Sequence, residues 1–122
     1  MRQRIVVTGI GGICGLGHDA ASIWDAMREG RSAIGPLGNE TLADIKVKIG
    51  SEIKALPDHG IDRKRTVSMD RFSLFAVIAA REALAQSGLK VDETNNSRIG
   101  ATVGIGVFGA ETIDQNYRKL LV

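Results

Sequence analysis

A glycine-rich stretch directly after a run of β-branched residues limits the folding of this chain more than any other feature. The stretch VVTGIGGICGLG covers residues 6–17 and holds five glycines. Continuous β-branched residues are typical of a buried strand, so the sequence predicts a strand over Arg4–Thr8. Glycine is needed where φ is positive or where another backbone approaches closely. The stretch therefore predicts a sharp turn from a strand towards a helix, with glycines making room.

A phosphate-binding loop is the main alternative for this stretch. A dinucleotide fingerprint needs glycines at the first, third and sixth positions directly after a strand. Gly9 and Gly11 fit, but the sixth position is Cys14, and a second frame that starts at Gly15 begins too far from the strand. The acidic residue expected about 20 residues further on is also missing. Nucleotide binding remains a minor alternative, and the Walker A pattern of a P-loop does not occur.

Cys14 is the only cysteine of the chain. A reactive cysteine needs a helix N-terminus or a basic partner, and His18 is close in sequence. Free cysteine is also among the most buried residue types, so a small packed residue in a turn is the favoured interpretation. A single cysteine forms no internal disulfide, which favours a reducing, cytoplasmic setting.

Strand and helix patterns alternate along the rest of the chain. Asp19 and Gly30 are good capping residues at the two ends of a helix, and Gly88 is a good terminator of a second one. The predicted elements are a helix over Ala20–Glu29, a loop over Arg31–Glu40 with turns at Gly35-Pro36 and Gly38-Asn39, a half-exposed strand in IKVKIGSEI (45–53), a helix over Met69–Gln86 capped by Ser68 or Asp70, a buried strand over Arg98–Gly104 and a last helix that carries Ile113, Tyr117, Leu120 and Leu121. This order predicts an α/β layered fold.

Two of these helices have apolar faces. The first carries Ile23, Trp24 and Met27 on one side. The long second helix has a stripe that is rich in alanine, and small side chains allow a neighbouring element to approach closely. The stripe comprises Phe72, Phe75, Ala76, Ala79, Ala83 and Leu84.

Composition excludes several classes of protein. The formal net charge is +2, which is too small for a dedicated nucleic-acid-binding surface. The longest apolar runs are too short for a membrane-spanning helix, and the start is not a signal peptide. No metal site or cofactor is expected. The last helix runs into Leu120, Leu121 and Val122 with no cap or polar tail, so we expect the chain to be the N-terminal part of a longer protein.

Four stretches, taken in order, resemble the β-ketoacyl-[acyl carrier protein] synthases. They are RIVVTGIGGICGLGHDAASIWDAMREGRSAIGPL, IDRKRTVSMDRFSLFAVIAAREAL, SGL and RIGATVGIGVFG, and together the resemblance extends over essentially all 122 residues. The chain is most similar to the elongating, type II synthases. The resemblance implies a thiolase-like fold, with five α-β-α-β-α layers in a homodimer. Residues 1–122 would be the first part of the N-terminal domain, without the catalytic segment.

The resemblance also implies a reaction. In the family, an acyl group moves from its carrier protein to a cysteine, malonyl-carrier loses CO₂, and the resulting carbanion attacks the thioester. The expected partners are acyl carrier protein and its acyl and malonyl thioesters, and no cofactor is needed. The family's cysteine and two histidines are expected beyond Val122. Cys14, His18 and His59 do not match those positions, so no catalytic residue is assigned here and the isolated segment is expected to be inactive.

Basic residues ahead of the long helix are candidates for docking the carrier protein. The resemblance assigns this role to Arg63, Lys64 and Arg65, because opposite charges orient partners and raise encounter rates. Relatives often continue the basic pattern where this chain has Val67 and Ser68, which leaves the choice of carrier open. A solvated charged loop is the alternative interpretation.

The second candidate region is GIGVFG, which resembles the turn that borders the acyl pocket in relatives. Val107 falls where the elongating type places an aliphatic gate. Phe108 stands in place of a usual glycine and Ile105 in place of a usual serine, so a narrower or reshaped pocket is expected. Packing of Phe108 in the core is the alternative.

Two other functions are compatible with the same resemblance. One is a synthase dedicated to polyketides or to specialised long-chain acids, which the departures at Ile105 and Phe108 leave open. The other is a non-catalytic partner subunit of an active synthase, which would lack the cysteine expected downstream.

Overall fold

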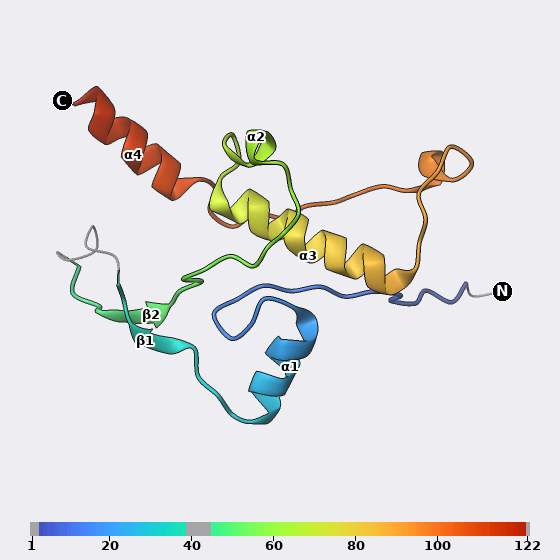
Figure 1. Cartoon of the computed structure of the whole chain (residues 1–122), viewed down its shortest axis with the longest axis horizontal. Helices are drawn as coiled ribbons and strands as arrows, with labels where there is room; N and C mark the ends of the chain where they lie inside the picture. Colours follow the sequence, from blue (N-terminus) through green and yellow to red (C-terminus); the bar gives the residue numbers. More distant parts are fainter. Residues whose placement is uncertain (1–2, 39–44, 122) are drawn as a thin grey trace.

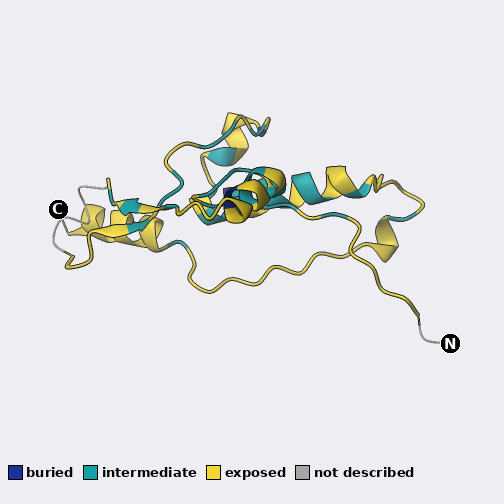
Figure 2. Cartoon of the chain, turned by 90° about the horizontal axis from the view of Figure 1, so that it is seen from below, coloured by how far each residue is buried: buried dark blue, intermediate teal, exposed yellow. Residues whose placement is uncertain are grey.

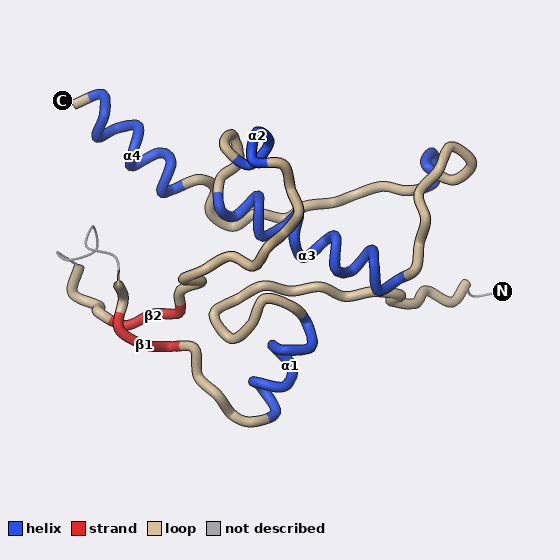
Figure 3. The backbone as a smooth tube through the Cα atoms, in the orientation of Figure 1, coloured by secondary structure: helices blue, strands red, loops and turns tan. Residues whose placement is uncertain are grey.

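The computed structural model describes residues 3–38 and 45–121. Its elements are α1 (Ala20–Arg28), β1 (Ile34–Pro36), β2 (Ile49–Ser51), α2 (Arg63–Thr66), α3 (Arg71–Ser87), a 3₁₀ turn (Asn96–Arg98) and α4 (Ala110–Leu120). Figure 1 shows α3 in the middle of the chain, with the N-terminal segment along one side of it. Figure 3 shows how much of the remaining backbone is loop.

The first helix begins and ends as the capping signals predict. Asp19 is the N-cap of α1, and its carboxylate accepts a 2.7 Å hydrogen bond from the backbone N–H of Ser22. This bond lowers the pKa of Asp19. Gly30 has a φ of 68° just past the helix, a left-handed conformation that favours glycine. On the helix surface Trp24 and Met27 stay exposed, and Ala26 is the buried residue.

The long helix is also confirmed, with its start now fixed. Asp70, and not Ser68, is the N-cap of α3, while Gly88 ends the helix with a φ of 66°. The Ser68 hydroxyl instead donates to the carbonyl oxygen of Arg65 in the preceding turn. Buried apolar residues are few in the described part of the chain: Ala26 on α1, Ile61 before α2 and Leu74 on α3.

A short antiparallel hairpin corrects two sequence predictions. β1 pairs with β2, with Gly35 opposite Gly50 at the centre. Gly35-Pro36, predicted as a turn in a loop, therefore lies in a strand. The predicted strand over 45–53 is reduced to β2, and Ile45 and Val47 lie outside it and are exposed. The turn predicted at Gly38-Asn39 falls partly on residues 39–44, outside the described residues.

The two predicted buried strands are wrong for the described structure. Neither Arg4–Thr8 nor Arg98–Gly104 forms a strand, and Ile5 is 96% exposed. A β-branched run gives strand propensity, but a strand also needs a neighbour for its N–H and C=O groups. Among residues 3–38 and 45–121 the only sheet is the β1–β2 hairpin, so the predicted layered sheet is not formed by them.

The last helix is confirmed as amphipathic but its apolar side is open. Asp114 and Arg118 pair one turn apart on its polar side, and this contact raises the pKa of Arg118. Ile113, Tyr117 and Leu120 are exposed. Figure 2 shows the buried and half-buried residues near the middle of the chain and mostly exposed residues along α4.

Candidate functional site

The glycine loop packs directly on one side of α3. A Cβ atom added to Gly9 would overlap the carbonyl oxygen of Ala83, and one added to Gly11 would overlap that of Ala79. The two alanines lie one turn apart on the stripe where the sequence predicts a close neighbour. The glycines therefore allow a backbone-to-backbone approach, as expected for a structural loop.

Two polar residues on the same side of α3 accept the hydrogen bonds of this loop. The Glu82 carboxylate accepts from the N–H of Gly12 at 2.9 Å and from the N–H of Ala20 at 2.8 Å. The Gln86 side-chain oxygen accepts from the N–H of Ile10 at 2.6 Å. These N–H groups are the kind that a phosphate-binding loop would offer, and here a protein carboxylate and an amide hold them. The structure thus favours the structural interpretation of the loop over nucleotide binding.

Glu82 and Gln86 were not singled out from the sequence. A signal was present, because residues 79, 82, 83 and 86 follow the i, i+3, i+4, i+7 spacing of one helix face. The two alanines on that face predicted the close approach. The polar pair on the same face, Glu82 and Gln86, indicates that the approaching segment brings unpaired N–H groups.

Cys14 and His59 occupy structural positions. Cys14 is half-buried and exchanges two backbone hydrogen bonds with Gly17, which closes a tight turn. His59 Nδ1 accepts from the N–H of Ile61, and the His59 carbonyl accepts from Arg81 on α3. Within the described ranges no three His, Cys, Asp or Glu side chains gather as a metal site.

The predicted docking residues lie together on α2. Arg63, Lys64 and Arg65 make up most of this one-turn helix, and all three are exposed. Asp62 caps the helix by accepting from the N–H of Lys64 at 3.0 Å. The cap orders the segment, so the three cations are presented from a defined turn and not from a loose loop.

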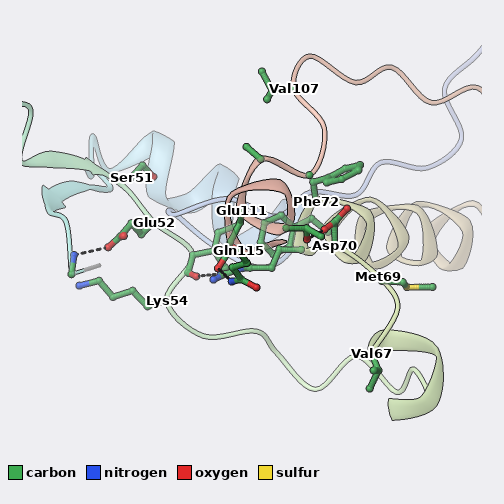
Figure 4. Close-up of a pocket in the computed structure, with 17 residues that line it drawn as sticks. Ser51, Glu52, Lys54, Val67, Met69, Asp70, Phe72, Val107, Glu111 and Gln115 are labelled. Carbon is green, nitrogen blue, oxygen red and sulfur yellow. Dashed lines mark hydrogen bonds between the residues drawn. The ribbon is translucent and has the colours of Figure 1, made fainter. Parts of the chain in front are cut away.

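An open groove of about 1040 Å³ lies beyond α2, between the start of α3, the β2 segment and the start of α4. Val67 and Met69, which follow α2, line it together with Phe72 and Phe75 of α3. Arg71 lies over the Phe75 ring, 5.6 Å from its centre. Figure 4 shows Val67 and Val107 on opposite sides of the groove in that view. One groove wall thus continues directly into the basic helix.

The two predicted acyl-pocket residues lie on the segment that enters α4. Val107 lines the large groove, and Val107 and Phe108 both line a smaller hollow of about 540 Å³ beside Ile113 and Tyr117. Phe108 is 68% exposed, so it does not pack in the core of the described structure, contrary to the alternative interpretation. The structure therefore brings Val107 to the groove, on the side opposite Val67 in the view of Figure 4.

No helix among the described residues is long and apolar enough to cross a membrane. Residues 2–120 match the model of the family described as "Beta-ketoacyl synthase, N-terminal domain". The chain is 60% identical over its whole length to "Nodulation protein E" of Rhizobium sp. (strain N33) and 59% identical to that of Rhizobium meliloti (strain 1021). It is 34% identical, over 98% of its length, to "3-oxoacyl-[acyl-carrier-protein] synthase 2" of Synechocystis sp..

The chain spans about 30% of the length of these relatives. The family model covers nearly all of the chain, which agrees with the resemblance carried by the four sequence stretches. A thiolase-like fold is the fold that this family implies. The chain belongs to the family of the beta-ketoacyl synthase N-terminal domain.

Proposed function

We propose that the complete protein is a condensing enzyme that joins an acyl thioester to malonyl-carrier protein and releases CO₂. The observation that carries the proposal is the match of residues 2–120 to the beta-ketoacyl synthase N-terminal domain. A relative named for 3-oxoacyl-[acyl-carrier-protein] synthesis supports it. The acyl group would pass to a cysteine outside these 122 residues. Loss of CO₂ would then leave a carbanion, which attacks the thioester carbonyl and expels the cysteine thiolate.

In this proposal the present chain supplies docking and acyl selection, and the complete protein is a cytoplasmic, five-layered homodimer. Arg63, Lys64 and Arg65 would dock the acidic carrier protein. Val107 and Phe108 would border the acyl chain. The rest of the chain would hold these residues in place through the contacts of α3 with the glycine loop.

A dedicated synthase for a specialised acyl chain is a second candidate. The chain is 54–60% identical to four nodulation proteins and 32–34% identical to the 3-oxoacyl-carrier synthases. The first group is named for nodulation and not for 3-oxoacyl-carrier synthesis, so higher similarity to it favours a role other than general fatty-acid elongation. Ile105 and Phe108, which differ from the usual pocket residues of the resemblance, support the same conclusion.

The activity is tested on the complete protein with acyl-carrier and malonyl-carrier substrates of several chain lengths. Mass spectrometry of the intact proteins should detect an acyl group on the enzyme and a 3-oxoacyl-carrier product two carbons longer. Absence of both would overturn the proposal and favour a non-catalytic partner subunit. A narrow set of accepted chains would favour the dedicated synthase.

Lys64→Glu should weaken carrier docking. The side chain is exposed on α2, so the change reverses a surface charge without removing a core contact. We expect the KM for carrier protein to rise about five- to thirtyfold at low salt, with a smaller effect at high salt. The kcat at saturating carrier should stay close to that of the parent.

Lys90→Glu is the matched control for this test. Lys90 is also exposed, but it follows the far end of α3, about 25 Å of helix away from α2. Lys90→Glu changes the net charge of the protein by the same amount as Lys64→Glu. Equal KM values for Lys64→Glu and the parent would remove Lys64 from the interface, and equal effects of both reversals would indicate a general charge effect.

Phe108→Gly should change the length of acyl chain that is accepted. Removing a ring beside the small hollow makes room, so the preference should move towards longer chains, by about tenfold in the ratio of kcat/KM values. Phe108→Ala separates side-chain size from added backbone freedom. Val91→Ala, an exposed apolar change after α3, is the control. Identical product profiles for Phe108→Gly and the parent would contradict the assignment.

A further inference from the structure

Asp70 caps α3 in an unusual way. Its backbone has the extended conformation of an N-cap residue, but its side chain makes no capping hydrogen bond to its own helix. The carboxylate instead accepts a hydrogen bond from the hydroxyl of Thr112, which lies in the first turn of α4. The side chain of the α3 N-cap residue thus bonds to a residue in the first turn of α4, 42 residues further along the chain.

The start of α4 lacks a cap of its own. Its N-cap residue is Gly109, which has no side chain to accept the first N–H groups. The Asp70 carboxylate lies so close that a Cβ added to Gly109 would be 2.9 Å from its Oδ2. A negative charge is favourable at a helix N-terminus, where unpaired N–H groups carry partial positive charge. Asp70 therefore adds a second carboxylate to that of Glu111, the acidic residue in the first turn of α4.

The same contact fixes the residues that precede α4. Within residues 3–38 and 45–121, the Thr112–Asp70 bond is the only side-chain hydrogen bond that joins α4 to another element. Gly109 has a φ of 46°, so the chain turns sharply there. Val107 and Phe108 lie two residues and one residue before this turn, and their position beside the groove and the small hollow depends on where the turn is held.

We propose that Asp70 is a positioning residue that, through Thr112, holds Val107 and Phe108 at the entrance to α4 and so sets the accepted acyl chain length. The inference rests on the proposed condensing activity and deepens it. In this role Asp70 acts through Thr112 and not through contact with substrate. Loss of its bond to Thr112 lets the turn at Gly109 shift, which changes the space beside Val107 and leaves the basic residues of α2 unaffected.

Thr112→Val tests this in the complete protein. Valine keeps the shape of threonine but removes the hydroxyl, so the fold should be retained. Because a hydrogen bond to a charged group is lost, the ratio of kcat/KM values for a long and a short acyl-carrier should shift about fivefold to tenfold. The KM for malonyl-carrier should stay unchanged, since docking on α2 is not altered. Thr112→Ser keeps a hydroxyl and should behave as the parent.

A double-mutant cycle identifies the partner. Asp70→Ala should shift the same ratio in the same direction, and Asp70→Ala combined with Thr112→Val should add little further. An unchanged ratio in Thr112→Val, or an equal shift in Thr112→Ser, would overturn the inference while the parent stays active. A lower unfolding temperature without any shift in the ratio would reduce Asp70 to a structural cap and would also overturn it. A parent that forms no 3-oxoacyl product would overturn the proposed function, and the inference would fall with it.

Discussion

Replacing Gly11 by alanine is expected to destabilise the complete protein by about 2–3 kcal/mol, which is among the larger effects a single methyl group can have. The added Cβ would overlap the Ala79 carbonyl oxygen and lie 2.9 Å from the carbonyl carbon. Both atoms are backbone atoms in the middle of α3, so no side-chain rotation relieves the contact. The loop or the helix must move, and either movement weakens the nearby bonds to Glu82. Denaturant titration of parent and variant measures the loss.

Two further variants show whether the backbone contact is the cause. Gly35→Ala places the same methyl group in the β1 strand, where nothing lies within 4 Å, and should change stability by less than about 0.5 kcal/mol. Ala79→Gly should not rescue Gly11→Ala, because the overlapping atoms remain. A Gly11→Ala protein as stable as the parent would contradict the close approach of the loop to α3.

Glu82→Ala is expected to cost about 2–4 kcal/mol of unfolding free energy. The carboxylate accepts two backbone N–H groups, from Gly12 and Ala20, and both bonds are partly buried. Alanine leaves both N–H donors without a partner. A hydrogen bond to a charged acceptor contributes more to stability than one to a neutral acceptor, so losing two of them costs more. Hydrogen exchange should also become faster at the N–H groups of Gly12 and Ala20, which gives a local measure of the same bonds.

Glu82→Gln separates the contribution of the charge from that of the acceptor oxygens. Glu82→Gln keeps one acceptor oxygen but places an NH₂ group against the other donor. Its unfolding free energy should therefore fall between that of the parent and that of Glu82→Ala. Glu93→Ala, at an exposed site after α3, is the control and should change stability by less than about 0.5 kcal/mol. If hydrogen exchange at Gly12 and Ala20 is as fast in Glu82→Gln as in Glu82→Ala, the negative charge, and not the number of acceptor oxygens, holds the loop.

Sequence patterns predicted most of the helical structure. Asp19, Gly30 and Gly88 fixed helix ends through capping contacts made within a few residues of each end. The alanine stripe also predicted where α3 is approached closely, which Gly9 and Gly11 confirm. The family, too, was indicated by four short stretches in the right order and is confirmed by the family model.

Patterns that depend on distant partners were less informative. Strands were predicted over Arg4–Thr8, which has a β-branched run, and over Arg98–Gly104, yet no described segment pairs with either. Gly35-Pro36 was predicted as a turn because glycine and proline are typical of turns. It became part of a strand because Gly50, far along the chain, lies opposite. Strand formation requires a neighbour, and the identity of the neighbour is a tertiary property.

The amino-acid sequence by itself determined α1, α3 and α4, the glycines that permit close packing, the basic composition of Arg63–Arg65 and the family of the chain. The helical turn at Arg63–Thr66 was not predicted. The tertiary structure alone decided that Glu82 holds Gly12 and Ala20, 70 and 62 residues away, and that Asp70 holds the start of α4. The physical reason is the range of the interactions. A cap is satisfied by N–H groups one turn away, whereas an acceptor on α3 has no partner until folding brings a distant segment with unpaired N–H or O–H groups beside it.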